Sequence, residues 1–190
     1  MEYTSCEAAA GALLRPAFAA VLTPLFGRER TETLLCAADA LYPALIARTP
    51  YDGGAHAPNH HSLLQTEYCL AVYRAADGAL SPARFETVLG DVFRTCKPFA
   101  AQAAQTGRAM FTPTWPAMRR AEYDRSRENE FGFQLRFVDG DTDTLFEVDY
   151  LSCPICALDY VLADLMGFHL ERTVTLASGR DRCDFRYFKR

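Results

Sequence analysis

Residues 132–150, GFQLRFVDGDTDTLFEVDY, decide how the fold is interpreted. Apolar side chains alternate with polar ones on either side of the DGDTD segment, for example Phe133, Leu135 and Phe137 before it. A period of two is typical of a strand with one buried face, and Asp and Gly between two such runs are typical of a turn. The sequence therefore predicts two antiparallel strands in this stretch.

The residues upstream follow a helical period instead. Apolar positions recur every three or four residues, as in Leu34, Ala38 and Leu41. Ser81 followed by Pro82 is typical of a helix start, because Ser caps free N–H groups and Pro is tolerated in the first turn. Helices are predicted over residues 16–26, 31–46 and 62–76, from 81 onward, and up to about residue 128 after a break at 111–116.

Downstream of the hairpin the period changes again. Residues 153–166 are predicted as a helix that ends before Gly167, and HLERTVTLA (169–177) and CDFRYFK (183–189) as two more strands. The prediction is a single α+β domain over 1–190, mostly helical in 1–130 and a sheet plus one helix in 131–190. We expect a helical N-terminal layer packed on a four-stranded antiparallel β-sheet, in the order β-β-α-β-β.

Composition narrows the classes of function. The 190 residues are 49% hydrophobic and 23% charged, which suits one folded core of an ordinary soluble protein. The net charge of −4 argues against a nucleic-acid partner, because such affinity comes from Lys and Arg paired with phosphates. We see no apolar run of about 18 residues and no basic signal-peptide start, so we expect a cytoplasmic protein without a membrane partner. The apolar surface of the helical layer is compatible with a homodimer.

Seven cysteines form an odd set spread over the whole chain. Such a set is typical of free thiols in a reducing compartment rather than of a disulfide scaffold. Cys6, Cys36, Cys69 and Cys96 lie in helical segments, where a free cysteine behaves as a small buried apolar residue. Reactive cysteines are therefore expected only in the C-terminal third.

The stretch DYLSCPICALDY, residues 149–160, places two cysteines and an acid at the start of a predicted helix. Cys153 falls in its first turn, where N–H dipoles lower a thiol pKa, and Cys156 shares a helix face with Asp159. A thiol beside a carboxylate suits nucleophilic attack with an acid/base partner, so these three are the candidate catalytic residues. The alternative is that Cys156 is a small core residue and Asp159 a solvated or capping acid.

The paired cysteines have other possible uses. A zinc site needs about four ligands, and Cys183 with a histidine would have to join Cys153 and Cys156. Because no second pair has ligand spacing, we expect no metal and no cofactor. A thioredoxin-like redox pair would require a parallel βαβ pattern, which the chain lacks, although a reversible Cys153–Cys156 disulfide in a thiol sensor stays open.

Arg172 is the candidate anchor for a substrate. In HLERTVTLA it shares a strand face with Leu170 and Val174, and an arginine in an apolar row needs an anionic partner. A substrate carboxylate is one such partner, since the guanidinium binds it in bidentate fashion. The alternatives are an internal pair with Asp159 or Asp184, or an edge position from which the side chain reaches water.

Two further regions supply candidate binding residues. The loop RTPYDGGAHAPNHH, residues 48–61, contributes Tyr51, Asn59 and His61, and a glycine-bearing loop between helices suits the wall or lid of a pocket. A histidine at this position is more often a surface or helix-capping residue, which is the alternative role for His61. Cys183 shares a predicted strand face with aromatic residues and is either a buried thiol or the rear wall of a pocket.

Several of these motifs together resemble the L-2-amino-thiazoline-4-carboxylic acid hydrolase family. They are CALDY (156–160), ERTVTLASGRDRCDFRY (171–187) and PYDGG (50–54) with Asn59. The resemblance implies a bacterial enzyme that opens the thiazoline ring of a cysteine-derived amino acid by adding water at its C=N carbon. It covers most of the chain, and the Cys-x-x-Asp, Arg-Thr and Cys-Asp-Phe pattern is its most specific part.

The resemblance suggests roles for the candidate residues. Cys153 or Cys156 would attack the carbon, or a water would, with Asp159 as the acid/base group and Arg172 anchoring a substrate carboxylate. The main rivals are another ring-forming or ring-opening enzyme of unusual amino-acid biosynthesis on the same scaffold, and a non-catalytic module that binds a small ligand or zinc. In each enzyme reading the partner is a small molecule with a carboxylate.

Overall fold

The structure is a computed structural model of the chain. It describes residues 5–50, 60–110, 112, 135–137, 145–150 and 158–190, of which 5–7, 110, 135–137 and 145–150 are described by their backbone alone. The chain divides into two compact units, Met1–Lys97 and Pro98–Arg190. This division does not test whether the two units fold as one domain, so the single-domain prediction stays a prediction.

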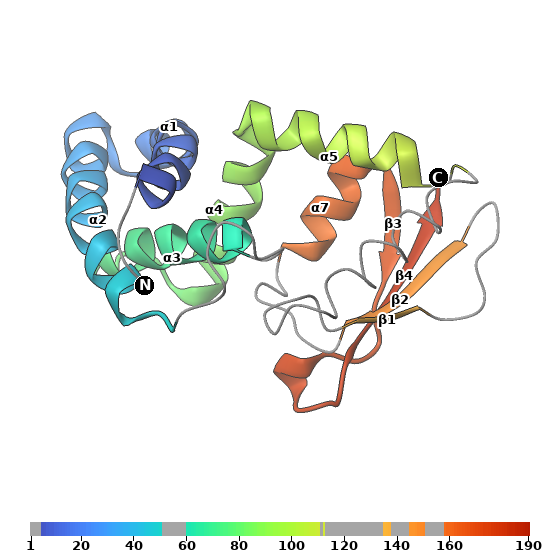
Figure 1. The fold of residues 1–190 in the computed structure, drawn as a ribbon. Coiled ribbons are helices and arrows are strands. Elements are labelled where there is room, and N and C mark those ends of the chain that lie inside the picture. The colour runs from blue at the N-terminus through green and yellow to red at the C-terminus, as the bar shows by residue number, and fades with distance from the viewer. Residues whose placement is uncertain (1–4, 51–59, 111, 113–134, 138–144, 151–157) are drawn as a thin grey trace. The chain divides into compact units, whose positions relative to one another are not determined.

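Four helices make up the described part of the first unit (Figure 1). They are α1 (Ser5–Phe26), α2 (Arg28–Arg48), α3 (His60–Ala75) and α4 (Pro82–Thr95). Helix α1 packs against each of the other three, and α2 packs against α3. The four helices are therefore held around a shared core rather than in a linear chain of contacts.

Aromatic side chains fill the centre of this core. The rings of Tyr42 and Tyr68 meet edge to face with 5.3 Å between centroids, and the Tyr42 hydroxyl donates to the Leu64 carbonyl oxygen at 3.1 Å. Phe18 of α1 packs on the edge of Tyr68 at 6.1 Å. Edge-to-face contacts of this kind add to the stabilisation from burial. Of the residues named for the helical period, Leu34 and Ala38 are buried, whereas Leu41 is 39% exposed, so the predicted face is buried only in part.

The helix boundaries follow the sequence signals in part. Ser81 caps α4 as predicted, because its hydroxyl accepts from the Arg84 N–H at 3.3 Å and Pro82 begins the helix. Pro24 lies inside α1 and does not end it, since the helix continues to Phe26. The helices also extend further than predicted at their N-terminal ends, with α1 beginning at Ser5 rather than at residue 16.

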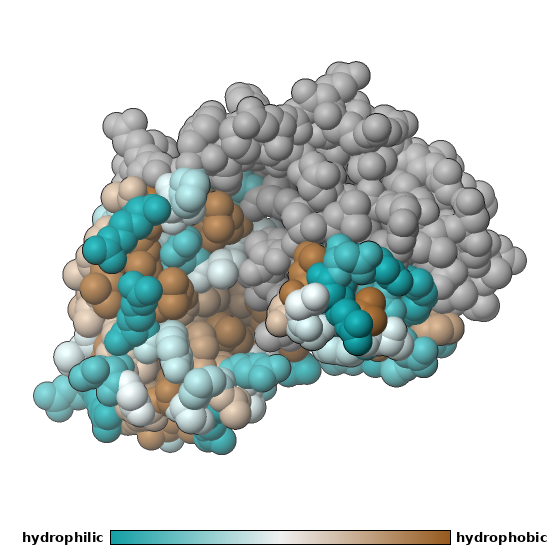
Figure 2. All heavy atoms as spheres, turned by 90° about the horizontal axis from the view of Figure 1, so that it is seen from below, coloured by the Kyte–Doolittle hydropathy of each residue, from teal (hydrophilic) through white to brown (hydrophobic). Residues whose placement is uncertain are grey.

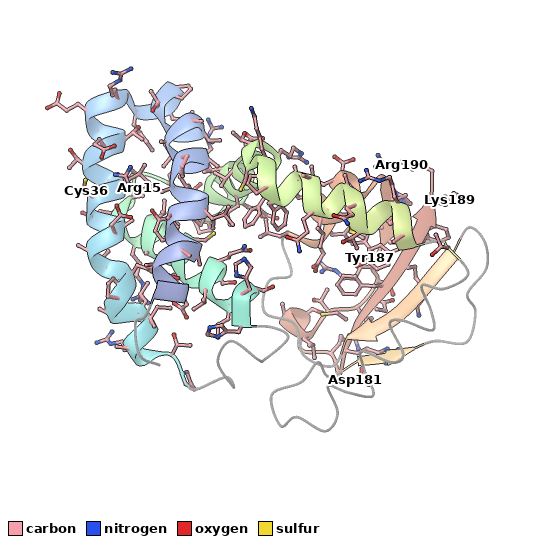
Figure 3. All side chains as sticks on the ribbon, turned by 45° about the horizontal axis from the view of Figure 1, so that its top comes forward. Arg15, Cys36, Asp181, Tyr187, Lys189 and Arg190 are labelled. Atoms are coloured by element: carbon pink, nitrogen blue, oxygen red, sulfur yellow. The ribbon has the colours of Figure 1, made fainter. Side chains whose placement is uncertain are left out.

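A charged network joins the first three helices at the surface. Arg15 of α1 donates to Glu32 at 2.6 Å and to Asp39 at 2.8 Å, both on α2. Tyr68 of α3 donates its hydroxyl to the other Asp39 oxygen at 2.8 Å. The Cys36 thiol lies 3.8 Å from Arg15, and Arg15 lies between α1 and α2 (Figure 3). Cys36 is exposed, contrary to the prediction that it is buried, whereas Cys69 and Cys96 are buried as predicted.

Helix α1 is long and apolar enough over Ala8–Phe26 to cross a membrane, by length and composition only, contrary to the expectation that no apolar run reaches about 18 residues. Leu14, Phe18 and Leu22 are buried inside the first unit, and 33% of this window is buried. A core helix of a soluble protein and a signal sequence both pass the same test, so the cytoplasmic localisation stays a prediction.

The second unit combines two helices with extended segments (Figure 1). Its elements are α5 (Lys97–Met110, from Pro98 onward), β1 (Leu135–Phe137), β2 (Leu145–Tyr150), α7 (Asp159–Met166), β3 (Phe168–Glu171), the 3-10 turn η2 (Leu176–Ser178) and β4 (Cys183–Lys189). Helix α5 touches the end of α7 at Gly107. A Cβ there would lie 2.0 Å from the Met166 carbonyl oxygen, so the close approach requires glycine.

The predicted fold class, an α+β domain with a helical layer packed on a four-stranded sheet, needs correction. In the part of the chain described in full, the fold is mostly helical, with 74% of residues in six helices, and its sheet is two-stranded and antiparallel. That sheet is β3 paired with β4, with Phe168 opposite Lys189 and Glu171 opposite Arg186. A four-stranded order, β1-β2-β4-β3, results only when the segments described by backbone alone are counted.

The difference has a local physical cause. The predicted strand 169–177 ends at Glu171, because the next N–H groups bond to a side chain, and the backbone bond to β4 there, from the Asp184 N–H to the Val174 carbonyl oxygen at 3.3 Å, is long. Asp184 accepts the N–H groups of Thr173 and Val174 at 2.9 and 2.7 Å. Short polar side chains often compete with ladder hydrogen bonds in this way. Among the described residues, the helix predicted over 153–166 begins at Asp159.

The described surface has few large apolar side chains. On the face drawn in Figure 2, hydrophilic and hydrophobic residues are interspersed. Leu25 and Leu41 of the first unit and Tyr160 of the second are the large apolar side chains that are exposed in the described part of the chain. The homodimer prediction is not tested by this distribution.

Candidate functional site

The lengths of α7 and β3 bring Asp159 and Arg172 together. Helix α7 begins at Asp159 and spans eight residues, which is about 12 Å along its axis. Gly167 ends it in the left-handed region (φ 85°), and β3 returns over four residues, about 13 Å. Helix and strand therefore have nearly the same length, and the residue after the strand comes back to the start of the helix.

Arg172 and Asp159 form an ion pair that is partly buried. Arg172 Nη1 donates to Asp159 Oδ2, and the two side chains are 9% and 16% exposed. Of the partners considered from the sequence, the structure therefore shows the internal pair with Asp159. Burial raises the pKa of Asp159 to about 7, and the attraction of the Arg172 guanidinium opposes that rise without cancelling it. The carboxyl group is consequently able to gain or lose a proton near neutral pH.

Two aromatic rings flank the guanidinium. Its central carbon lies 5.1 Å from the centroid of the Tyr160 ring and 5.5 Å from that of Phe185. Phe185 is buried in β4, whereas Tyr160 is 47% exposed. A cation over a ring face gains electrostatic attraction while its N–H groups stay available as in-plane donors. Tyr160 is therefore the aromatic neighbour of Arg172 that is in contact with solvent.

Asp184 fixes the chain immediately after Arg172. Its carboxylate accepts the Thr173 N–H at 2.9 Å, the Thr173 hydroxyl at 2.6 Å and the Val174 N–H at 2.7 Å. Burial acts to raise the pKa of Asp184, but these hydrogen bonds outweigh it and lower the pKa. Asp184 thus stays ionised as a structural acceptor, in contrast to Asp159.

Cys183 lies at the start of β4 beside these residues. Its side chain is fully buried, and its sulfur accepts the Leu176 N–H at 3.2 Å. Residues 183, 185 and 187 alternate with their neighbours along the strand, so Cys183 and Phe185 share a face. This agrees with the expectation of a buried thiol, and its predicted place in a pocket wall stays a prediction.

The remaining predicted site residues are not brought into this group by the described structure. Cys153, Cys156, Tyr51 and Asn59 lie outside the described residues. His61 belongs to the first turn of α3, in the other unit, and its neighbour His60 is the buried histidine of that turn. Within the described ranges, no group of three or more His, Cys, Asp and Glu side chains is arranged to hold a metal ion.

Sequence reasoning did not assign Tyr160 and Phe185 to the site. Tyr160 follows Asp159 directly, and Phe185 lies two residues after Cys183 on the same strand face. These two positions can be read from the sequence. The contact of either ring with Arg172, however, depends on how α7, β3 and β4 pack. Alternation alone predicts a shared face and not a cation–π partner.

In comparisons with known proteins, no family model, no curated protein and no solved structure matches the chain.

Proposed function

We propose that the protein is a hydrolase acting on a carbon–nitrogen bond, which opens a C=N-containing heterocycle of a small amino-acid-derived substrate. The observation that carries the proposal is the partly buried Arg172–Asp159 pair, in which the carboxyl group titrates near pH 7. Perturbed acid groups beside a fixed cation are typical of acid/base sites. The resemblance to thiazoline carboxylate hydrolases supplies the substrate class.

In this proposal Asp159 delivers a proton to the ring nitrogen. A general acid works best when its pKa lies near the working pH, because it is then present in both forms. Arg172 anchors the substrate carboxylate through its planar fork of N–H donors. The hydrogen bonds of Asp184 to Thr173 and Val174 hold the backbone beside Arg172 in place.

The nucleophile is proposed to be Cys153 or Cys156, or a water activated at the same carbon. Attack at the amidine-like carbon moves the electron pair of the C=N bond onto the ring nitrogen, which takes the proton from Asp159. With water as the nucleophile, the ring sulfur then leaves as a thiol and the ring is open. With a cysteine as the nucleophile, the ring sulfur leaves in the same way, and water then attacks the carbon that is bound to the enzyme and releases the cysteine thiol. Cys183, Tyr51, Asn59 and His61 are proposed to line the substrate.

Turnover of a panel of 2-amino-thiazoline and related ring carboxylates tests the proposal directly, with release of a free thiol as the signal. We expect one panel member to be opened, and Asp159→Asn and Arg172→Ala to lower kcat/KM by about 100-fold or more. Arg15→Ala is the matched control, since it removes a paired arginine from the surface network of the first unit. The hydrolase proposal fails if Cys153→Ala, Cys156→Ala and Arg172→Ala all leave turnover unchanged.

The nucleophile is identified by the rate of iodoacetamide labelling of each cysteine against pH. Cys69 is an internal control, because burial raises its thiol pKa to about 12 and it should label last. Cys36 is exposed and reports an accessible thiol. We expect Cys153 or Cys156 to label at a lower pH than Cys36. Labelling of both only after unfolding would leave an activated water as the nucleophile.

The same Arg172–Asp159 pair would also serve a module that binds a small carboxylate without chemistry. Binding of a panel member without any turnover would favour that function. Another ring-processing enzyme is distinguished by turnover of a different heterocycle that still requires Arg172.

A further inference from the structure

One guanidinium at this site faces two possible carboxylates. Arg172 already bonds to Asp159, and both side chains are largely withdrawn from water. A ligand carboxylate that approached Arg172 would bring a second negative charge to a single buried cation. Such an arrangement leaves one net negative charge in a poorly solvated place, which is costly.

Other charges around Asp159 are engaged elsewhere. Asp164 of α7 pairs with Arg190 at 3.0 Å, and His169 of β3, the strand packed on α7, lies 3.5 Å from Glu171. The carboxylate of Asp184 accepts hydrogen bonds from the Thr173 hydroxyl and the Val174 N–H. The remaining charged side chains on α5 and β4 are Lys97, Arg108, Arg186 and Lys189. Among the charged groups in the described part of the site, Arg172 is the one that changes the pKa of Asp159.

Resting on the proposed function, we infer that a ligand carboxylate replaces Asp159 on Arg172, and that Asp159 takes up a proton from solvent and donates it in a hydrogen bond to the ligand. The one covalent bond formed in this exchange is the O–H bond of the protonated Asp159. The proton comes from the buffer, and the net charge of the site is the same before and after binding. The exchange therefore avoids the buried negative charge described above.

The exchange defines a class of ligand. The carboxylate must reach Arg172 while an acceptor atom, such as a ring nitrogen next to the carboxylate, meets the protonated Asp159. Nitrogen heterocycles with a carboxylate beside the nitrogen satisfy both conditions, whereas acids without the nitrogen satisfy one.

The probe for this inference is pyridine-2-carboxylate, titrated into the full chain in a calorimeter. Running the titration in two buffers with different ionisation enthalpies counts the protons taken up. We expect about one proton per ligand above neutral pH, and a Kd that rises about tenfold between about pH 8 and pH 9. Benzoate has no acceptor nitrogen and is expected to bind several-fold more weakly.

Two variants separate the exchange from simple charge attraction. Asp159→Asn should bind pyridine-2-carboxylate without proton uptake and with a Kd independent of pH, and Arg172→Met should lose binding. Near-ultraviolet circular dichroism checks that both are folded, and the pH series of the unaltered protein tests the inference without any variant. The inference is overturned if the unaltered protein does not bind the probe, or binds it with a flat pH profile and no proton uptake.

The outcome is distinguishable from that of the hydrolase proposal. Proton-coupled binding of the probe with no turnover of any ring carboxylate would contradict the hydrolase proposal and support the carboxylate exchange on Arg172. Turnover that depends on Arg172, combined with pH-independent binding of the probe, would do the reverse.

Discussion

Each unit of the molecule holds an arginine in a charged network, and the two networks differ in their exposure to water. Arg15 in the first unit is 31% exposed and pairs with Glu32, which is 58% exposed. Arg172 in the second unit is 9% exposed and pairs with Asp159, which is 16% exposed. Both arginines make short contacts to carboxylates, so geometry alone does not distinguish them.

The pKa values of the two carboxyl groups, Glu32 and Asp159, shift in opposite directions. The hydrogen bond from Arg15 lowers the pKa of Glu32, because water continues to solvate its charge. Burial raises the pKa of Asp159, although an arginine bonds to it in the same way. At these two ion pairs the sign of the pKa shift follows the solvation of the carboxyl group rather than the presence of the arginine. Asp184 differs, because its hydrogen bonds outweigh burial and lower its pKa.

The largest expected effect is on the partly buried pair. Arg172→Met leaves Asp159 without its described cation, and we expect the free energy of unfolding to fall by about 3–5 kcal/mol at pH 8, measured by urea denaturation. The loss should be smaller at pH 5, where Asp159 is protonated. The double variant Asp159→Leu with Arg172→Met should recover most of the stability. An equal loss at both pH values would mean that packing rather than charge is responsible.

A second large effect is expected where α5 meets α7. Gly107→Ala places a methyl group 2.0 Å from the Met166 carbonyl oxygen, so the helix backbones must separate. We expect a loss of about 3 kcal/mol, at the upper end for overpacking. Gly11→Ala in the first unit is the matched control, because its Cβ would meet the Tyr68 ring at 3.1 Å, a side chain that can shift. Equal losses in both variants would contradict the close approach.

The pH dependence of stability sharpens the comparison further. The pKa of Asp159 rises on folding from 3.8 to about 7, so its contribution to stability is full below 3.8 and is lost as pH rises through about 7. The unaltered protein should therefore lose up to about 1.4 kcal/mol per pH unit in this window relative to Asp159→Asn. The test compares unfolding free energies of the two proteins from pH 4 to pH 8. Parallel profiles would show that the pKa of Asp159 is not raised.

The smallest effect is expected from the exposed network. Arg15→Met removes two ion pairs from the surface, where water solvates the carboxylates that remain. We expect a change in unfolding free energy near the resolution of a denaturation experiment, and smaller still in high salt. A loss as large as that of Arg172→Met would break the distinction between the two networks.

Local signals in the sequence predicted part of this arrangement. The cap at Ser81 and the strand at residues 183–189 coincide with α4 and β4, because each depends on neighbouring residues alone. Asp159 was among the partners considered for Arg172, but spacing could not choose it over Asp184 or a substrate. The predicted strand through 169–177 was too long, because the hydrogen bonds of Asp184 compete with strand pairing only once β4 lies beside it.

By itself, the sequence determined which segments have a helical or an alternating period and which residue types stand at their junctions. Period and capping are properties of a few adjacent residues, and they do not depend on the rest of the chain. Only the tertiary structure decided that α7 and β3 match in length and meet at Asp159 and Arg172. It also decided that this pair is partly buried whereas that of Arg15 is solvated. Burial depends on residues distant in sequence, and burial is what raises the pKa of Asp159 to about 7.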